Sequence, residues 1–152
     1  MTAERKQILV VDDELGSRES LKAILYKIYD VVTAESAEQA GKILEGQHVD
    51  LILLDIMMPQ KDGITFLKEL SESHSDIPVI MVSAYSSPRF VFQSLRLGAA
   101  DYLNKPFDVS EVRFVVERCL QGKPRQHPLP PVEGDTTGDV TLKKPDFRVG
   151  NP

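Results

Sequence analysis

The chain has 152 residues, a single cysteine and a formal net charge of −5. One cysteine excludes an internal disulfide, and the excess of acidic residues argues against direct binding of nucleic acid phosphates by this chain. No apolar run approaches the roughly 18 residues that a membrane span requires, so we expect a cytoplasmic protein with no membrane partner.

Strand and helix patterns alternate from the start of the chain. Residues 7–11 are a continuous apolar run, which is typical of a strand buried on both faces. Apolar residues then recur at helical spacing over 21–28, and 31–34 is a short β-branched strand. Ser36, followed three residues later by a glutamine, predicts a capping box that opens a helix over 37–44.

The second half of the chain continues the alternation. Its predicted elements are strands at 51–54, 78–82 and 101–104 and helices at 63–70, 91–98 and 108–119. Five strands that alternate with five helices predict right-handed βαβ units and one parallel sheet with helices on both faces. The fold class is therefore α/β, with a doubly wound sheet.

The last 32 residues differ from the rest in composition. Residues 121–152 hold six of the ten prolines and four of the nine glycines but only six apolar residues. Such a segment cannot bury a core. We therefore expect one folded domain over 5–120 and a linker or disordered tail over 121–152. The tail can be the start of an interdomain linker, a free tail, or a segment that folds on a partner.

Several chemically active side chains follow directly after predicted strands. They are Asp12, Asp13, Asp55, Ser83 and Lys105. Parallel strands end on the same side of a sheet, where α/β proteins bind their ligands, so these residues should converge there. Three carboxylates at close range repel one another, and oxygen ligands without imidazole or thiolate favour Mg²⁺ or Mn²⁺. With the lysine and the hydroxyl, this set suits phosphoryl transfer to Asp55 as the nucleophile.

The order of these motifs resembles a known family. The combination comprises Val-Val-Asp12-Asp13-Glu14, Leu-Leu-Asp55-Ile-Met-Met-Pro59, Asp62-Gly63, Ser83-Ala84 and Tyr102-Leu-Asn-Lys105-Pro106-Phe107. Together these motifs resemble the receiver domain of two-component response regulators over about 6–120. The resemblance implies a flavodoxin-like receiver fold with strand order 2-1-3-4-5. Residues 98–108 are similar to receivers attached to enhancer-binding transcription activators, which implies a role in transcription regulation.

The resemblance implies a role for each site residue. Asp55 would accept a phosphoryl group from a phosphohistidine on a sensor histidine kinase. Asp13 and Asp55 would bind Mg²⁺ with the backbone carbonyl of Met57, and Asp12 would act in the same acidic pocket through water. Lys105 would bridge Asp55 at rest and the phosphoryl group once it forms. Such a protein catalyses its own phosphorylation and dephosphorylation and is not a turnover enzyme.

The resemblance also implies a switch and a surface for partners. Ser83 would move toward the phosphoryl group, and the ring of Tyr102 would then turn inward. The fourth helix, fifth strand and fifth helix would form the output surface and pair two copies in a homodimer. The Lys105–Pro106 peptide bond is cis in such proteins. Met57 next to the site cannot orient an attacking water well, which predicts slow loss of the phosphoryl group.

Other interpretations remain open on the sequence. A Mg²⁺-dependent phosphatase of the haloacid-dehalogenase type also uses an aspartate nucleophile, although its nucleophile follows the first strand. A scaffold with a degenerate site is a third possibility, which the complete set of acids, serine and lysine disfavours. Ser83 could instead cap a helix, and Tyr102 could simply be a half-buried aromatic residue on an edge strand.

Overall fold

A five-stranded parallel sheet forms the centre of the protein. The computed structural model describes residues 4–84 and 88–123. The strands are β1 (Gln7–Val11), β2 (Asp30–Ala34), β3 (Leu51–Asp55), β4 (Val79–Ser83) and β5 (Asp101–Asn104). They pair in the order β2-β1-β3-β4-β5, with all four pairs parallel. The predicted doubly wound α/β fold and its strand order are confirmed.

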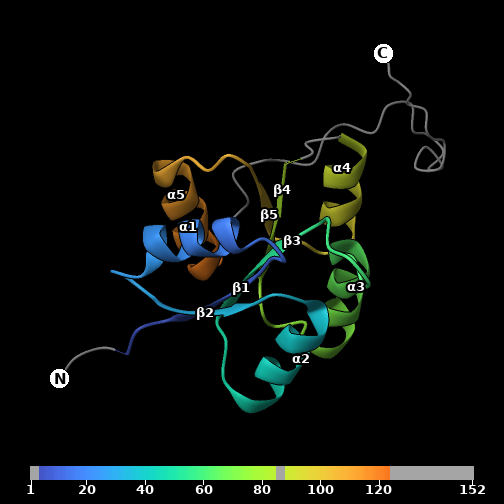
Figure 1. Ribbon diagram of the computed structural model, residues 1–152, viewed down its shortest axis with the longest axis horizontal. Helices are drawn as coiled ribbons and strands as arrows, with labels where there is room; N and C mark the ends of the chain where they lie inside the picture. The colour runs from blue at the N-terminus through green and yellow to red at the C-terminus, as the bar shows by residue number, and fades with distance from the viewer. Residues whose placement is uncertain (1–3, 85–87, 124–152) are drawn as a thin grey trace.

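Five helices cover the two faces of the sheet. They are α1 (Leu15–Leu25), α2 (Ala37–Gly46), α3 (Gly63–Ser73), α4 (Pro88–Arg96) and α5 (Val109–Leu120). Helices α1 and α5 lie on one side of the sheet, and α2, α3 and α4 lie on the other (Figure 1). Since both faces are covered, the inner strands β1, β3 and β4 each contain a run of four apolar residues, which is why they lack alternation in the sequence.

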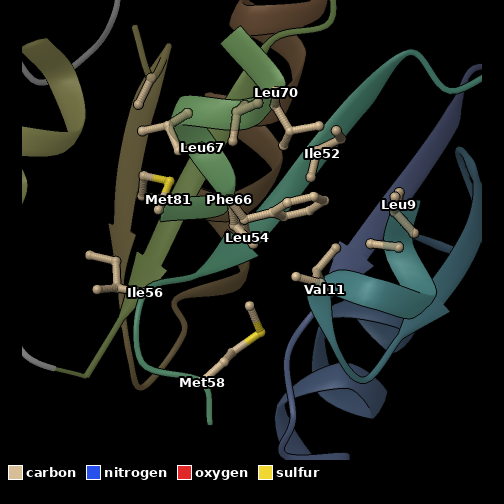
Figure 2. Packing of buried hydrophobic residues seen from close by; sticks show 14 of the residues in the cluster. Leu9, Val11, Ile52, Leu54, Ile56, Met58, Phe66, Leu67, Leu70 and Met81 are labelled. Atoms are coloured by element: carbon tan, nitrogen blue, oxygen red, sulfur yellow. The ribbon is translucent and has the colours of Figure 1, made fainter. Parts of the chain in front are cut away.

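Neighbouring residues of each strand point to opposite faces and enter two separate cores. Leu9, Ile52 and Leu54 belong to the core under α2, α3 and α4, whereas Ile8 and Leu53 belong to the core under α1 and α5. Figure 2 shows the first of these cores, in which side chains of β3 and β4 pack against α3. The sheet is thus held from both sides, and its strand ends form a rigid base for polar residues.

Helix ends follow the predicted capping residues in two places. The Ser36 hydroxyl accepts a hydrogen bond from the Gln39 backbone N–H at 3.0 Å and begins α2. The Asp108 carboxylate accepts one from the Glu111 backbone N–H at 3.0 Å and begins α5. In both cases the side chain satisfies a backbone donor that the first helical turn leaves unpaired.

The predicted extent of two helices was wrong. The stripe over 21–28 includes Ile28, but α1 ends at Leu25 and Ile28 is half exposed in the connection to β2. Gly98 was placed in the fourth helix, yet α4 ends at Arg96 and Gly98 has a positive φ of 106°. A glycine in this conformation is typical of the residue just past a helix end, because other residues adopt it only at a cost.

The end of the predicted domain lies close to the end of the described chain. Helix α5 ends at Leu120, and the predicted tail over 121–152 lies outside the described residues from residue 124 onward. The limits of the domain and the nature of the tail therefore stay predictions. Within 4–84 and 88–123, no helix has the length and apolar character needed to cross a membrane.

Candidate functional site

The sheet brings the predicted polar residues to its carboxyl edge. Asp12 directly follows β1, and Asp55 and Ser83 are the last residues of β3 and β4. Lys105 directly follows β5, and its backbone N–H donates to the Ser83 carbonyl at 3.0 Å. Backbone pairing therefore fixes where each side chain starts, before any contact between the side chains themselves.

Three carboxylates form a cluster at this edge. Asp12, Asp13 and Asp55 each place an oxygen within 4.8 Å of the others. Asp12 and Asp55 are buried, whereas Asp13 is exposed. Three acids at such distances repel one another, and the repulsion is strongest where burial weakens screening by water.

The Lys105 ammonium lies within the cluster. Its Nζ lies 2.9 Å from Oδ2 of Asp12 and 3.4 Å from Oδ1 of Asp55. The peptide bond that follows, between Lys105 and Pro106, is cis. One positive charge thus partly compensates two buried negative charges that belong to different strands.

The electrostatics of Asp55 reflect incomplete compensation. Burial, followed by the negative charge of Asp12, raises the pKa of Asp55 to about 7, although Lys105 acts in the opposite direction. For Lys105, burial alone would lower the pKa, but the ion pair with Asp12 and the charge of Asp55 raise it overall. The site therefore carries an excess of negative charge that a cation would relieve.

The residues present suit a divalent metal ion. Among the described residues, no donor is aligned for a hydrogen bond with the buried Oδ2 of Asp12, although Lys105 is its ion-pair partner. This buried oxygen has lone pairs available for a ligand, and two further carboxylates lie beside it. Together they offer the oxygen ligands that hard cations such as Mg²⁺ prefer. The cluster of Asp12, Asp13 and Asp55 could therefore bind a metal.

Glu14 belongs to the site, and the sequence analysis assigned it no role. Its Oε1 lies 3.2 Å from Nζ of Lys105 and accepts a hydrogen bond from the Ser17 hydroxyl at 2.8 Å. Ser17 and Lys105 lower the pKa of Glu14. The sequence feature that could have indicated this role is the position of Glu14 directly after two aspartates at a strand end. A third acidic residue in a row is, however, usually a solvated turn residue.

The other predicted site residues, Ser83, Tyr102 and Met57, differ in how deeply they are buried. Ser83 is buried as the last residue of β4, and Ala84, which follows it, is not helical, so Ser83 does not cap a helix. Tyr102 is half-buried and packs against the core under α2, α3 and α4. The Met57 side chain is half exposed, two residues past Asp55. Whether these residues act as predicted stays a proposal.

Comparison with known proteins places the chain in a family. The family model described as "Response regulator receiver domain" matches residues 8–117. The chain is 41% identical over 122 residues to "Probable transcriptional regulator ycf27" of Cyanophora paradoxa, covering 80% of this chain and 51% of that protein. It is 38% identical over 122 residues to "Regulatory protein AtoC" of Escherichia coli, covering 80% of this chain and 26% of that protein.

Solved structures share the fold. One is NtrX from Brucella abortus in complex with ADP, with a TM-score of 0.75 and 31% identity over 78% of this chain and 28% of that chain. A CheY-like response regulator receiver domain protein from Methanospirillum hungatei gives a TM-score of 0.74 and 29% identity, covering 78% of this chain and 96% of that chain. The haloacid-dehalogenase alternative receives no support from these comparisons.

The chain covers nearly all of a single-receiver protein but only part of the larger relatives. The chain spans about half of the ycf27 protein and about a quarter of AtoC. Four observations point to the same family: the fold, the strand order, the acidic cluster with its lysine, and the match to the family model. The chain belongs to the family of response regulator receiver domains of two-component systems.

Proposed function

We propose that this domain accepts a phosphoryl group on Asp55 from the phosphohistidine of a sensor histidine kinase. The observation that carries the proposal is the position of Lys105, whose Nζ lies 3.4 Å from the Asp55 carboxylate and 2.9 Å from that of Asp12. A lysine held beside a buried carboxylate is suited to neutralise the charge of an arriving phosphoryl group. The proposed compartment is the cytoplasm.

The proposed metal is Mg²⁺, with Mn²⁺ as a substitute. Asp12, Asp13 and Asp55 would hold it, together with the backbone carbonyl of Met57. The proposal is supported by the three carboxylate oxygens within 4.8 Å of one another and by the lack of imidazole or thiolate in this set. When bound, the ion supplies positive charge that neutralises the phosphoryl oxygens.

The proposed transfer is a substitution at phosphorus. A carboxylate oxygen of Asp55 forms the new bond to phosphorus while the bond to the imidazole nitrogen of the kinase breaks, and its electron pair stays on the imidazole. Lys105 binds a phosphoryl oxygen as charge moves onto the group. The buried Ser83 hydroxyl, at the end of the neighbouring strand β4, can donate to another. The product is an aspartyl phosphate.

The proposed output is a change in the surface formed by α4, β5 and α5. Ser83 and Tyr102 would link it to the site, because they lie on the neighbouring strands β4 and β5. Tyr102 is half-buried against the core under α2, α3 and α4, so its ring lies between that core and solvent. A homodimer through this surface is the proposed assembly, and transcription regulation, as in the relatives, is the proposed role of the whole protein.

The direct test is phosphorylation of the full chain by acetyl phosphate. With Mg²⁺ we expect the intact mass to increase by one phosphoryl group, and solution size to change if the domain dimerises. Asp55→Asn should abolish the mass increase, whereas Asp76→Asn, an exposed matched control, should retain it. A chelator should also abolish it.

Two outcomes of this test contradict the proposal. A phosphoryl group that remains on the protein in Asp55→Asn would assign the chemistry to another residue. Repeated turnover of a small phosphate ester, lost in Asp55→Asn, would favour a phosphatase over a signalling module, since a receiver holds the phosphoryl group and does not release product continuously.

A further inference from the structure

The Lys105 ammonium is shared among three carboxylates. Its Nζ lies 2.9 Å from Oδ2 of Asp12, 3.2 Å from Oε1 of Glu14 and 3.4 Å from Oδ1 of Asp55. A lysine ammonium carries three N–H donors. The contact with Glu14 is also a hydrogen bond, whereas Asp12 and Asp55 are ion-pair partners of the same ammonium. An incoming anion must therefore compete with these carboxylates for Lys105.

The three carboxylates differ in how easily they can be released. The side chains of Asp12 and Asp55 are 2% and 5% exposed, whereas that of Glu14 is 66% exposed. A buried carboxylate that loses its counter-ion is strongly destabilising, while an exposed one is readily rehydrated. Glu14 is thus the partner that Lys105 can leave at the lowest cost in free energy.

The surroundings of Glu14 allow its side chain to move while its backbone stays in place. Its backbone N–H donates to Oδ1 of Asp12 at 2.9 Å, and its carbonyl accepts from the Arg18 backbone N–H at 3.2 Å at the start of α1. Beside the ion pair lies a groove of about 290 Å³, lined by residues that include Glu14, Ser17 and Lys105. The carboxylate can swing into this groove toward water.

We propose that Glu14 is a positioning residue that holds Lys105 in the resting domain and competes with the incoming phosphoryl group for it. The inference rests on the proposed function, phosphorylation of Asp55. As the bond between Asp55 and phosphorus forms, Lys105 exchanges Glu14 for a phosphoryl oxygen, and Glu14 turns to water. Since every transfer breaks this ion pair, Glu14 slows the phosphorylation of Asp55.

Removal of the Glu14 charge tests the competition. In the full chain with acetyl phosphate and Mg²⁺, we expect Glu14→Gln to accelerate phosphorylation by about two- to fivefold, the range that one exposed ion pair provides. Glu19→Gln is the matched control, because Glu19 is exposed on α1 and is not among the three carboxylates around Lys105. Its rate should stay near that of the wild type. An unchanged or slower rate for Glu14→Gln overturns the inference.

A second comparison separates competition for Lys105 from general repulsion of an anionic donor. In a Lys105→Met background, Glu14→Gln should be phosphorylated no faster than Glu19→Gln, because the ammonium for which Glu14 and the phosphoryl group compete is absent. An acceleration that persists there overturns the inference, since it would arise from the charge of Glu14 alone.

A third measurement needs neither metal nor phosphoryl transfer. Without divalent cations, an amine-acylating reagent should modify Lys105 about two- to fivefold faster in Glu14→Gln than in Glu19→Gln, as measured by peptide mass spectrometry. If Lys105 is labelled equally fast in the two variants while the wild type is still phosphorylated on Asp55, the inference about Glu14 is overturned and the proposed function stands. Failure of the wild type to gain a phosphoryl group overturns the proposed function and the competition with it.

Discussion

Asp55 combines burial with a local excess of negative charge. It is 4% exposed, and burial together with Asp12 raises its pKa to about 7 despite the nearby Lys105. In the unfolded chain the pKa returns to an ordinary value near 3.8. A group whose pKa is higher in the folded state favours folding fully at low pH, and this contribution is lost as pH rises through the folded pKa.

We therefore predict that, with a chelator present, the free energy of unfolding falls as pH rises from about 4 to about 7. Asp55→Asn should remove most of this slope and be more stable than the wild type at pH 8 by about 1–3 kcal/mol, since Lys105 and water adjust to part of the full shift. Urea unfolding at several pH values measures it, with Asp76→Asn as the control. Equal slopes in the wild type and Asp55→Asn would contradict the prediction.

Met57 leads to a prediction about how long the phosphoryl group persists. Its thioether side chain is half exposed two residues beyond Asp55 and orients water poorly. Tyr85, two residues beyond Ser83, is the second residue that the sequence predicts to flank the attacking water, and it lies outside the described residues. Met57→Asn should shorten the lifetime of the phosphorylated state, measured by intact mass after removal of the donor. A lifetime as long as that of the wild type would refute this role.

At the scale of elements, the start of α3 holds the backbone of Asp55 in place. The Asp62 carboxylate caps the helix by accepting from the Thr65 backbone N–H at 2.8 Å, and the Gly63 N–H donates to the Ile56 carbonyl at 2.8 Å. A Cβ on Gly63 would lie 2.1 Å from the Asp55 carbonyl oxygen. Only glycine allows the helix to approach the strand end this closely, because the obstructing atoms are backbone.

Gly63→Ala should therefore destabilise the domain. We expect a loss of about 1–3 kcal/mol in the free energy of unfolding, as for other substitutions that overfill a packed site. Gly41→Ala in α2 is the matched control. It has nothing within 4 Å of the added Cβ and should stabilise by about 0.5–1 kcal/mol through helix propensity. Thermal or urea unfolding measures both, and equal effects of the two variants would rule out the close approach.

At the scale of the whole molecule, the two covered faces of the sheet leave its carboxyl edge for chemistry. Residues from the ends of β1, β3, β4 and β5 meet there, although they lie far apart in the chain, as do Glu14 and Lys105, which are 91 positions apart. Any ligand that binds this edge links strands from across the sheet. A ligand that binds this site should therefore raise the free energy of unfolding of the whole domain.

Mg²⁺ should accordingly stabilise the entire domain. At a concentration a hundredfold above its dissociation constant, binding to the folded state alone adds about 2.7 kcal/mol to the free energy of unfolding. We expect the thermal midpoint to rise with Mg²⁺ in the wild type and in Glu19→Gln, and to rise much less in Asp13→Asn, whose carboxylate belongs to the cluster. A full rise in Asp13→Asn would exclude this carboxylate as a ligand.

The sequence alone predicted the elements, the fold class and the place of most site residues. Continuous apolar runs identify the inner strands β1, β3 and β4, because these strands lie between two helical layers. Polar residues directly after parallel strands then emerge at one edge of the sheet. Asp12, Asp55 and Lys105 were found in this way. The local sequence pattern was enough to place these residues, because each of them lies at the end of a strand and the strand fixes its position in the sheet.

Tertiary structure alone decided how these residues share their charges and how tightly the elements pack. The contact of Glu14 with Lys105, the exposure of Ile28 beyond α1 and the approach of Gly63 to Asp55 depend on distances between separate elements. Hydrophobic periodicity describes only which face of an element is buried. Which side chains then meet depends on how the strands and helices stack, and that is a property of the folded chain as a whole.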